Sequence, residues 1–128
     1  MGVNKSFLVV TGGAGFVGSN MIQLLLKKTK FNIISLDNYS SGNKLNHIRN
    51  RRIRYVNADT KDIKSKLKSY SKLIHTIFHF GEFSRIYQSF KNFDRCLDSN
   101  VLGSKEVFDF CLKNKIKLIY SATSATLG

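Results

Sequence analysis

Short apolar runs alternate along the chain with longer stretches in which apolar residues recur at helical spacing. The runs predict five strands, at residues 7–11, 31–36, 53–57, 73–80 and 116–120. The periodic stretches predict three helices, at residues 16–28, 61–72 and 92–113, and residues 44–52 predict a short basic helix or coil. A continuous apolar run such as Phe7-Leu8-Val9-Val10 is typical of a strand buried on both faces.

Strands that alternate with helices indicate a parallel sheet, because a parallel crossover needs a helix-sized connection. We therefore predict an α/β fold, a Rossmann-type doubly wound parallel sheet of about five strands in the order 3-2-1-4-5. The 128 residues suit one domain with one core, so residues 1–128 are expected to form a cofactor-binding domain without a substrate domain.

Each predicted helix carries an apolar stripe that is expected to face the sheet. In the order of the chain, the stripes comprise Val17, Met21, Leu24 and Leu25; then Ile63, Leu67 and Tyr70; then Phe93, Leu97, Val101, Ser104, Phe108, Cys111 and Leu112. Asn100 lies on the last stripe, and a buried amide there must find hydrogen bonds inside the protein.

The composition adds a formal net charge of +13 at pH 7, with basic residues scattered from Lys5 to Lys117. The scatter favours a general compositional bias over a nucleic-acid site, although one local cluster comprises His47, Arg49, Arg51, Arg52 and Arg54. No stretch is apolar enough to span a membrane, and we expect a cytoplasmic protein. Cys96 and Cys111 have no metal-binding or redox spacing, so no metal is expected and both are interpreted as reduced core thiols.

A glycine cluster between the first strand and the first helix is the strongest chemical pattern. In Thr11-Gly12-Gly13-Ala14-Gly15-Phe16-Val17-Gly18, an early glycine makes the tight turn, Gly15 lets backbone approach a pyrophosphate, and Gly18 lets the helix pack on the strand. The free N–H groups of the helix start suit phosphate oxygens. The alternative is a glycine-rich turn with no ligand.

Polar residues follow the next three strands, where ligands bind in such sheets. Asp37 can accept the hydroxyls of an adenosine ribose, which favours NAD over NADP, and the alternative is an ordinary turn aspartate. Asp59, followed by Thr60, is placed to bond an adenine amino group or, equally well, to cap the next helix. Phe80-Gly81 ends the fourth strand, beside the first.

These motifs together resemble the first half of the NAD-dependent epimerases and dehydratases of the extended short-chain dehydrogenase/reductase family, the UDP-glucose 4-epimerase type. The resemblance follows the chain in order over essentially all its residues. The motifs that carry it are Thr11-Gly12-x-x-Gly15-x-x-Gly18, Leu36-Asp37-Asn38, Asn57-Ala58-Asp59, Phe78-His79-Phe80-Gly81, Asn100-x-x-Gly103 and Ser121-Ala122-Thr123 through Gly128.

The resemblance implies NAD as cofactor and a nucleotide sugar as substrate of the complete enzyme. It assigns the pyrophosphate to Gly12, Gly15 and Gly18 with Phe16 and Val17, the ribose to Asp37 and Asn38, the adenine to Asp59 and Thr60, and the nicotinamide side to Phe80 and Gly81. It places Asn100 near the cofactor and assigns to Thr123 a hydrogen bond with the substrate hydroxyl that is oxidised.

Three sequence features depart from the family pattern. The proton-transferring Tyr-x-x-x-Lys expected after the fifth strand is absent from the 128 residues, and Tyr87 with Lys91 matches its letters only by coincidence, before the third helix. Glu82 replaces a small neutral residue, and its charge would repel a pyrophosphate unless Arg85 pairs with it. Leu127 replaces an aromatic residue.

Three hypotheses follow. The first is the NAD-binding portion of a nucleotide-sugar epimerase or dehydratase that acts by transient hydride transfer. The second is a non-catalytic NAD-binding remnant, or a split-enzyme subunit that associates with a second copy or a complementing chain through the edge of the fifth strand. The third and last in rank is a basic nucleic-acid-binding protein.

Overall fold

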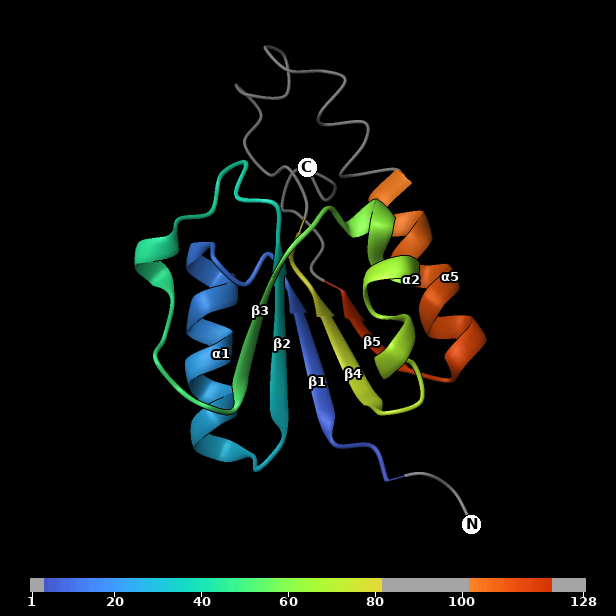
Figure 1. Cartoon of the computed structure of the whole chain (residues 1–128), viewed down its shortest axis with the longest axis horizontal. Coiled ribbons are helices and arrows are strands. Elements are labelled where there is room, and N and C mark those ends of the chain that lie inside the picture. Colours follow the sequence, from blue (N-terminus) through green and yellow to red (C-terminus); the bar gives the residue numbers. More distant parts are fainter. Residues whose placement is uncertain (1–3, 82–101, 121–128) are drawn as a thin grey trace, which may run out of the picture.

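A five-stranded parallel sheet forms the centre of the molecule (Figure 1). The computed structural model describes residues 4–81 and 102–120, and the structural statements below concern these residues. The strands are β1 (Phe7–Thr11), β2 (Asn32–Asp37), β3 (Ile53–Asn57), β4 (Ile74–His79) and β5 (Lys117–Tyr120). Their order is β3-β2-β1-β4-β5, which confirms the predicted doubly wound sheet.

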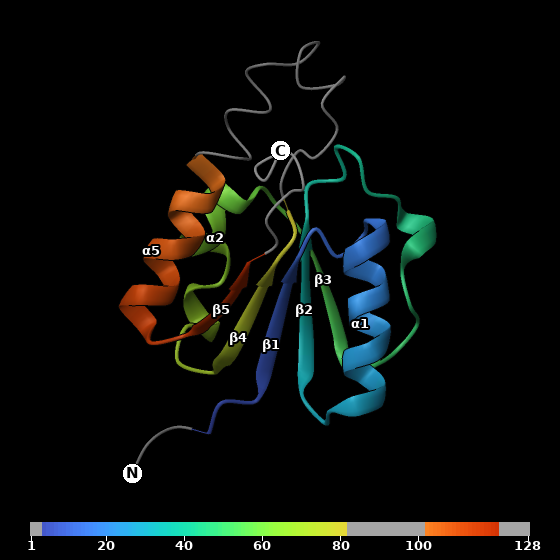
Figure 2. The same ribbon diagram turned by 180° about the vertical axis from the view of Figure 1, so that it is seen from behind.

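Helices cover both faces of the sheet, with α1 (Phe16–Lys28) on one side and α2 (Ile63–Lys66) and α5 (Ser104–Asn114) on the other (Figures 1 and 2). Alternate residues of each strand therefore enter different cores: Val10 packs with Ile22 of α1, and Val9 packs with the cluster that includes Val107 of α5. Burial on both faces explains the continuous apolar runs of the strands.

The buried face of α1 differs from the predicted stripe. The residues that enter the core are Gly18, Ser19, Ile22 and Leu25, whereas Val17 and Leu24 are about half exposed. The packing of Gly18 against the backbone of Gly12 sets this rotation of the helix, because positions 18, 22 and 25 follow one face of an α-helix.

The predicted helix at 61–72 is instead three short turns: η2 (Thr60–Asp62), α2 and η3 (Lys68–Tyr70). Ile63 and Leu67 are buried as predicted, and Tyr70 is half-buried with its ring edge against Phe7. Two buried anchors in a segment of lysines and serines give little packing energy to sustain a continuous helix. The short basic segment at 44–52 contains η1 (Lys44–Asn46), as predicted.

Helix α5 is confirmed over its described length, but its buried face is rotated from the predicted stripe. Ser104, Val107, Phe110 and Cys111 are buried, whereas Phe108 is 38% exposed and Leu112 is 80% exposed. The predicted stripe stepped four residues from Ser104 to Phe108. The buried face instead steps three residues from Ser104 to Val107, and residues three apart also share a helix face. Residues 92–101 of the predicted helix, which include Cys96 and Asn100, lie outside the described residues.

Burial controls the chemistry of the Cys111 thiol. Desolvation raises its pKa from the ordinary 9.0 to about 11, so the contribution of this group to stability is lost as the pH rises from about 9 to 11. In a Cys96→Ser background we expect Cys111 to react with a thiol reagent at pH 8 more than tenfold more slowly in the native protein than in urea. Equal native and denatured rates would contradict this burial.

Candidate functional site

The carboxyl ends of the strands lie at one edge of the sheet, where the glycine loop between β1 and α1 crosses the sheet. Gly12 adopts a left-handed φ of 70°, and its amide donates to Leu36 O at 2.7 Å, which ties the loop to β2. The amide of Gly15 then donates to Gly12 O at 3.1 Å and closes the turn. The loop is thus held by its own backbone before α1 begins.

The glycines of this loop fall into two kinds. A Cβ at Gly12, Gly13 or Gly18 would lie 2.8 Å from Phe80 O, 1.9 Å from Ser35 Oγ or 2.1 Å from Gly12 O, all closer than real Cβ contacts. A Cβ at Gly15 would meet only Gly12 O, at 3.4 Å, an ordinary contact. Packing of the protein therefore requires glycine at the first three positions and leaves space beside Gly15.

The start of α1 offers uncapped amides beside that space. Gly15 is the N-cap residue and supplies no side-chain cap, and the first turn contains no acidic residue. Phe16 is 82% exposed and Val17 is 55% exposed, so their side chains take no part in the core. The first N–H groups of a helix lack intrahelical partners and carry the positive end of its dipole, which suits an anion.

Asp37 joins the end of β2 to the glycine loop. Its Oδ2 accepts from the Ala14 amide at 3.0 Å and its Oδ1 accepts from the Tyr39 amide at 2.8 Å. The second contact is an ordinary aspartate turn, but the first extends 23 residues back to the loop. The carboxylate is largely buried beside Ala14 of the glycine loop, and each oxygen retains a lone pair for a further donor.

Asn38 and Asp59 connect the ends of β2 and β3, since the amide of Asn38 donates to the carboxylate of Asp59. Asp59 precedes η2 at the N-cap position, yet its side chain makes no capping hydrogen bond. The capping alternative for Asp59 is therefore wrong in this structure. Thr60 is buried, with its methyl group 3.0 Å from the place of a Cβ on Gly81.

A buried hydrogen-bond network beneath Phe80-Gly81 was missed by the sequence analysis. Thr11 Oγ1 accepts from the amides of Phe80 at 3.0 Å and Gly81 at 2.9 Å, so its proton is left for His79 Nδ1, 2.7 Å away. This requires the Nε2–H tautomer of His79, whose Nε2 then donates to Ser104 Oγ at 3.0 Å. The network holds the backbone at the end of β4 against the glycine loop and α5.

Two tyrosines and a histidine support the segment after Asp37. Tyr39 has a φ of 60°, and its hydroxyl lies 2.8 Å from His47 Nε2, while the His47 ring stacks on Tyr55 at 3.8 Å. Burial, followed by the nearby Asp37 carboxylate and then Tyr55, raises the pKa of the Tyr39 hydroxyl above its ordinary 10.0. His47 therefore belongs to the scaffold of this loop.

The basic cluster singled out in the sequence does not form one surface. His47 stacks on Tyr55, Arg54 donates to the Tyr70 hydroxyl at 2.6 Å, and Arg52 donates to Leu26 O, Thr29 O and Phe31 O around the end of α1. Three members of the cluster thus have partners in three different parts of the fold.

Several sequence assignments lie outside the described residues and have no structural account here: Glu82, Arg85, Tyr87, Lys91, Asn100, Thr123 and Leu127. Among residues 4–81 and 102–120, no group of three or more His, Cys, Asp or Glu side chains is placed to hold a metal ion. Within the same ranges, no helix has the length and apolar character needed to cross a membrane.

The fold and the glycine loop define a Rossmann-type dinucleotide-binding domain. Residues 8–128 match the sequence profile of the NAD dependent epimerase/dehydratase family, and the chain belongs to that family.

Solved structures with the same fold include three epimerases. An epimerase from Methanothermobacter thermautotrophicus is 29% identical, with a TM-score of 0.84, and the match covers 94% of this chain and 36% of that one. The UDP-glucose 4-epimerase of Thermotoga maritima, solved with UDP-glucose, is 28% identical, with a TM-score of 0.80, and the match covers 91% of this chain and 38% of that one. The UDP-N-acetylglucosamine 4-epimerase of Methanobrevibacter ruminantium, in complex with UDP-N-acetylmuramic acid, is 27% identical, with a TM-score of 0.83, and the match covers 98% of this chain and 40% of that one. The chain therefore spans well under half the length of these enzymes.

Proposed function

We propose that residues 1–128 are the NAD-binding domain of a nucleotide-sugar epimerase or dehydratase. Two of the similar structures carry a UDP sugar, which supports a nucleotide sugar as the substrate of the complete enzyme. Bound NAD would supply a transient hydride acceptor, and the residues of this chain would bind and orient it.

The observation that carries the proposal is the space beside Gly15. Packing accounts for the other glycines of the loop, but not for this one, where a Cβ would meet only an ordinary contact. A pyrophosphate at the start of α1 needs such a space, because its oxygens must approach the backbone closely. The amides of Phe16, Val17 and Gly18 would then bind the phosphates, while Gly12 and Gly18 maintain the turn.

The hydrogen bond from the Ala14 amide to Asp37 supports the assignment of this carboxylate to the adenosine ribose, because it joins Asp37 to the glycine loop. Its remaining lone pairs suit ribose hydroxyls, and its negative charge disfavours the 2′-phosphate of NADP. Asn38, bonded to Asp59, would contact the same ribose, and Asp59 with Thr60 would border the adenine. These contacts support NAD as the preferred dinucleotide.

Phe80 and Gly81, fixed by Thr11, would border the nicotinamide, because they lie at the end of β4 on the other side of the loop from Asp37. From the family resemblance, Asn100 would lie near the cofactor and Thr123 would orient the substrate hydroxyl. A hydroxyl in that role positions the substrate, while another group moves the proton.

Replacing Gly15 with serine tests the proposal. Gly15 has the extended backbone of an N-cap, φ −83° and ψ 177°, and serine is a better N-cap than glycine. We expect the unfolding temperature to stay equal or rise, while the affinity for NAD, measured by titration calorimetry, falls at least tenfold. Gln23→Ala, exposed on the same helix, is the control and should change neither quantity.

The result that would overturn the proposal is undiminished NAD affinity in Gly15→Ser, or no NAD binding by the folded parent chain. The alternative, a non-catalytic NAD-binding module or a subunit completed by another chain, shares this site. It is favoured by β5, which pairs only with β4 among the described residues and so leaves an edge for a further strand.

A further inference from the structure

The turns that enter the five strands form one continuous surface at the amino edge of the sheet. Hydrogen bonds link the entry of β2 to those of β3 and β1, and the entry of β1 to that of β4: Ile33 N donates to Arg52 O, Asn32 N to Ser6 O, and Ser6 N to Leu73 O. Lys5 Nζ donates to Lys115 O and so joins the entry of β1 to that of β5, beyond β4. Neighbouring strands lie about 4.8 Å apart, so this edge is roughly 20 Å long.

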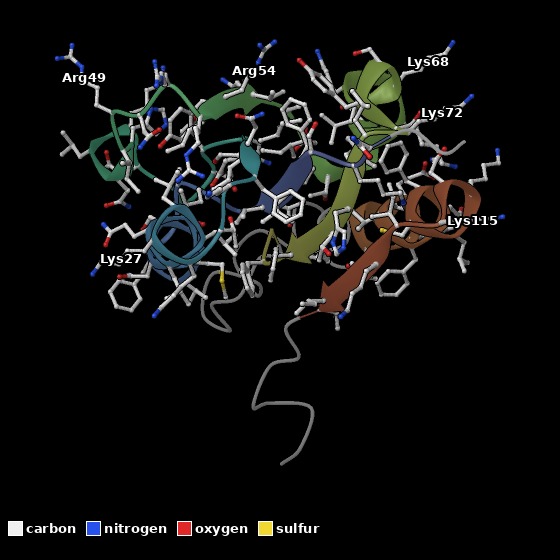
Figure 3. The ribbon with its side chains drawn as sticks, turned by 90° about the horizontal axis from the view of Figure 1, so that it is seen from below. Lys27, Arg49, Arg54, Lys68, Lys72 and Lys115 are labelled. Carbon is white, nitrogen blue, oxygen red and sulfur yellow. The ribbon has the colours of Figure 1, made fainter. Side chains whose placement is uncertain are left out.

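Every one of these entries carries a basic side chain. The residues are Lys5 before β1, Lys28 and Lys30 before β2, Arg51 before β3, Lys72 before β4 and Lys115 before β5. We call these six residues the basic rim. All except Lys5 are exposed, and Figure 3, which views the molecule from below, shows labelled members such as Lys72 and Lys115 pointing away from the ribbon. Scattered positions in the sequence thus meet at one edge of the fold.

The acidic side chains of the described residues lie elsewhere. Asp37 and Asp59 are at the carboxyl edge, and Glu106 and Asp109 of α5 pair with Lys64 and Lys105. No acidic residue occurs in the entry turns, and none of the ion pairs found within residues 4–81 and 102–120 involves the rim. The rim is therefore a row of like charges without compensation among these residues.

Arg52 holds this row in place. Its guanidinium donates to three carbonyl oxygens at the end of α1, at 2.5 to 3.0 Å, and so fixes the entry of β3 against the turn that carries Lys28 and Lys30. These bonds occupy the one arginine of the turn that faces inward, whereas Arg51 beside it is exposed. The charges consequently sit on a rigid edge, which lowers the ordering cost of binding a polyanion.

We infer that the basic rim binds the phosphate backbone of a nucleic-acid duplex without reading its bases. A duplex carries about one negative charge per 1.7 Å of its axis, which suits several cations gathered along one edge of the fold. The uncharged polar residues of the turns add donors for phosphate oxygens: Asn4, Asn50, Ser71 and Asn114.

Two absences within the described entry turns favour a duplex over other polyanions. No Phe, Tyr or Trp ring is exposed there to stack on single-stranded bases, since Phe31 is half-buried and its ring packs 5.4 Å from that of His75. No large apolar side chain is exposed there either, so the rim lacks the residues that insert into a lipid surface.

The rim and the proposed cofactor site lie at opposite edges of the sheet, separated by strands of four to six residues. Such strands are about 13–20 Å long, so neither ligand would touch the other. Binding to the rim should therefore be indifferent to NAD. The inference consequently does not rest on the proposed cofactor function.

The test is fluorescence anisotropy with a labelled duplex of mixed sequence, titrated with the full chain at 50–200 mM salt. We expect the logarithm of the association constant to fall with the logarithm of the salt concentration with a slope of about −4 to −5, as for four to six phosphate contacts. The variant Lys30→Gln/Arg51→Gln/Lys72→Gln should lose at least tenfold in affinity and about three units of slope. Saturating NAD should leave the binding unchanged.

A control variant of equal net charge, Lys44→Gln/Lys66→Gln/Lys105→Gln, alters exposed lysines away from the rim and should bind within threefold of the parent. Circular dichroism confirms that both variants are folded. Equal losses in the two variants would overturn the inference in favour of bulk charge. It would also be overturned by no binding at 50 mM salt, or by preferential binding to phosphatidylserine vesicles at the same salt.

Discussion

A Gly18→Ala variant is expected to lose about 2–3 kcal/mol of unfolding free energy, the usual cost of overpacking a tight site. The added Cβ would lie 2.1 Å from Gly12 O and 2.7 Å from Gly12 C. The backbone of Gly12 cannot move away from the added Cβ, because Gly12 is itself packed tightly against the end of β4. A Cβ built on Gly12 would lie only 2.8 Å from Phe80 O. The helix propensity gained from alanine, about 1 kcal/mol at most, does not offset this clash.

Urea denaturation measures the effect, with Gly15→Ser as the control substitution in the same loop. Gly18→Ala should lower the urea midpoint, whereas Gly15→Ser should leave it equal or raise it, since of these two positions only 18 lacks room for a side chain. A midpoint for Gly18→Ala equal to that of the parent would show that the helix can move away from the loop, and would remove the explanation given above for the rotation of α1.

A Thr11→Val variant is expected to lose about 2–4 kcal/mol, because the isosteric side chain cannot replace the hydroxyl. Thr11 Oγ1 accepts from the amides of Phe80 and Gly81, and donates to His79 Nδ1. Phe80 N retains a second acceptor, Thr11 O at 3.2 Å, so the largest loss should fall on Gly81. Hydrogen exchange should therefore accelerate at the Gly81 amide more than at the Phe80 amide.

Thr11→Ser is the matched control, because it keeps the oxygen and removes only a methyl group. It should cost about 1 kcal/mol, close to the transfer free energy of one buried methylene group, and leave the exchange rate of Gly81 near that of the parent. If the serine variant loses as much stability as the valine variant, packing of the methyl group supports this edge and the hydrogen-bond network does not.

The sheet could be predicted from the sequence because burial on both faces leaves strands such as β1 and β2 as nearly continuous apolar runs. The faces that α1 and α5 turn towards the sheet could not be predicted from the sequence. On α1 the small residues Gly18 and Ser19 face the core where an apolar pattern favours Val17, and this depends on how closely a loop approaches. Such an approach is a property of the assembled fold, not of spacing along a helix.

At the candidate site, the positions of Gly12 and Asp37 followed from local motifs. The requirement for glycine at position 13 did not, because Ser35 Oγ, which excludes a Cβ there, comes from a neighbouring strand. Nor did the pairing of Thr11 with His79, which lie 68 residues apart. The available signal was a histidine within the apolar run of β4, since a buried imidazole requires partners.

The contrast between Gly15 and its neighbours also has a genetic consequence. Every missense change in a glycine codon adds at least a Cβ, so the codons for Gly12, Gly13 and Gly18 have no neighbour that fits this fold without movement. The codon for Gly15 has such neighbours, because a Cβ at this position would meet only an ordinary contact. The codons for Gly12, Gly13 and Gly18 are therefore constrained by the need to fold, whereas packing within the described residues places no such constraint on the codon for Gly15.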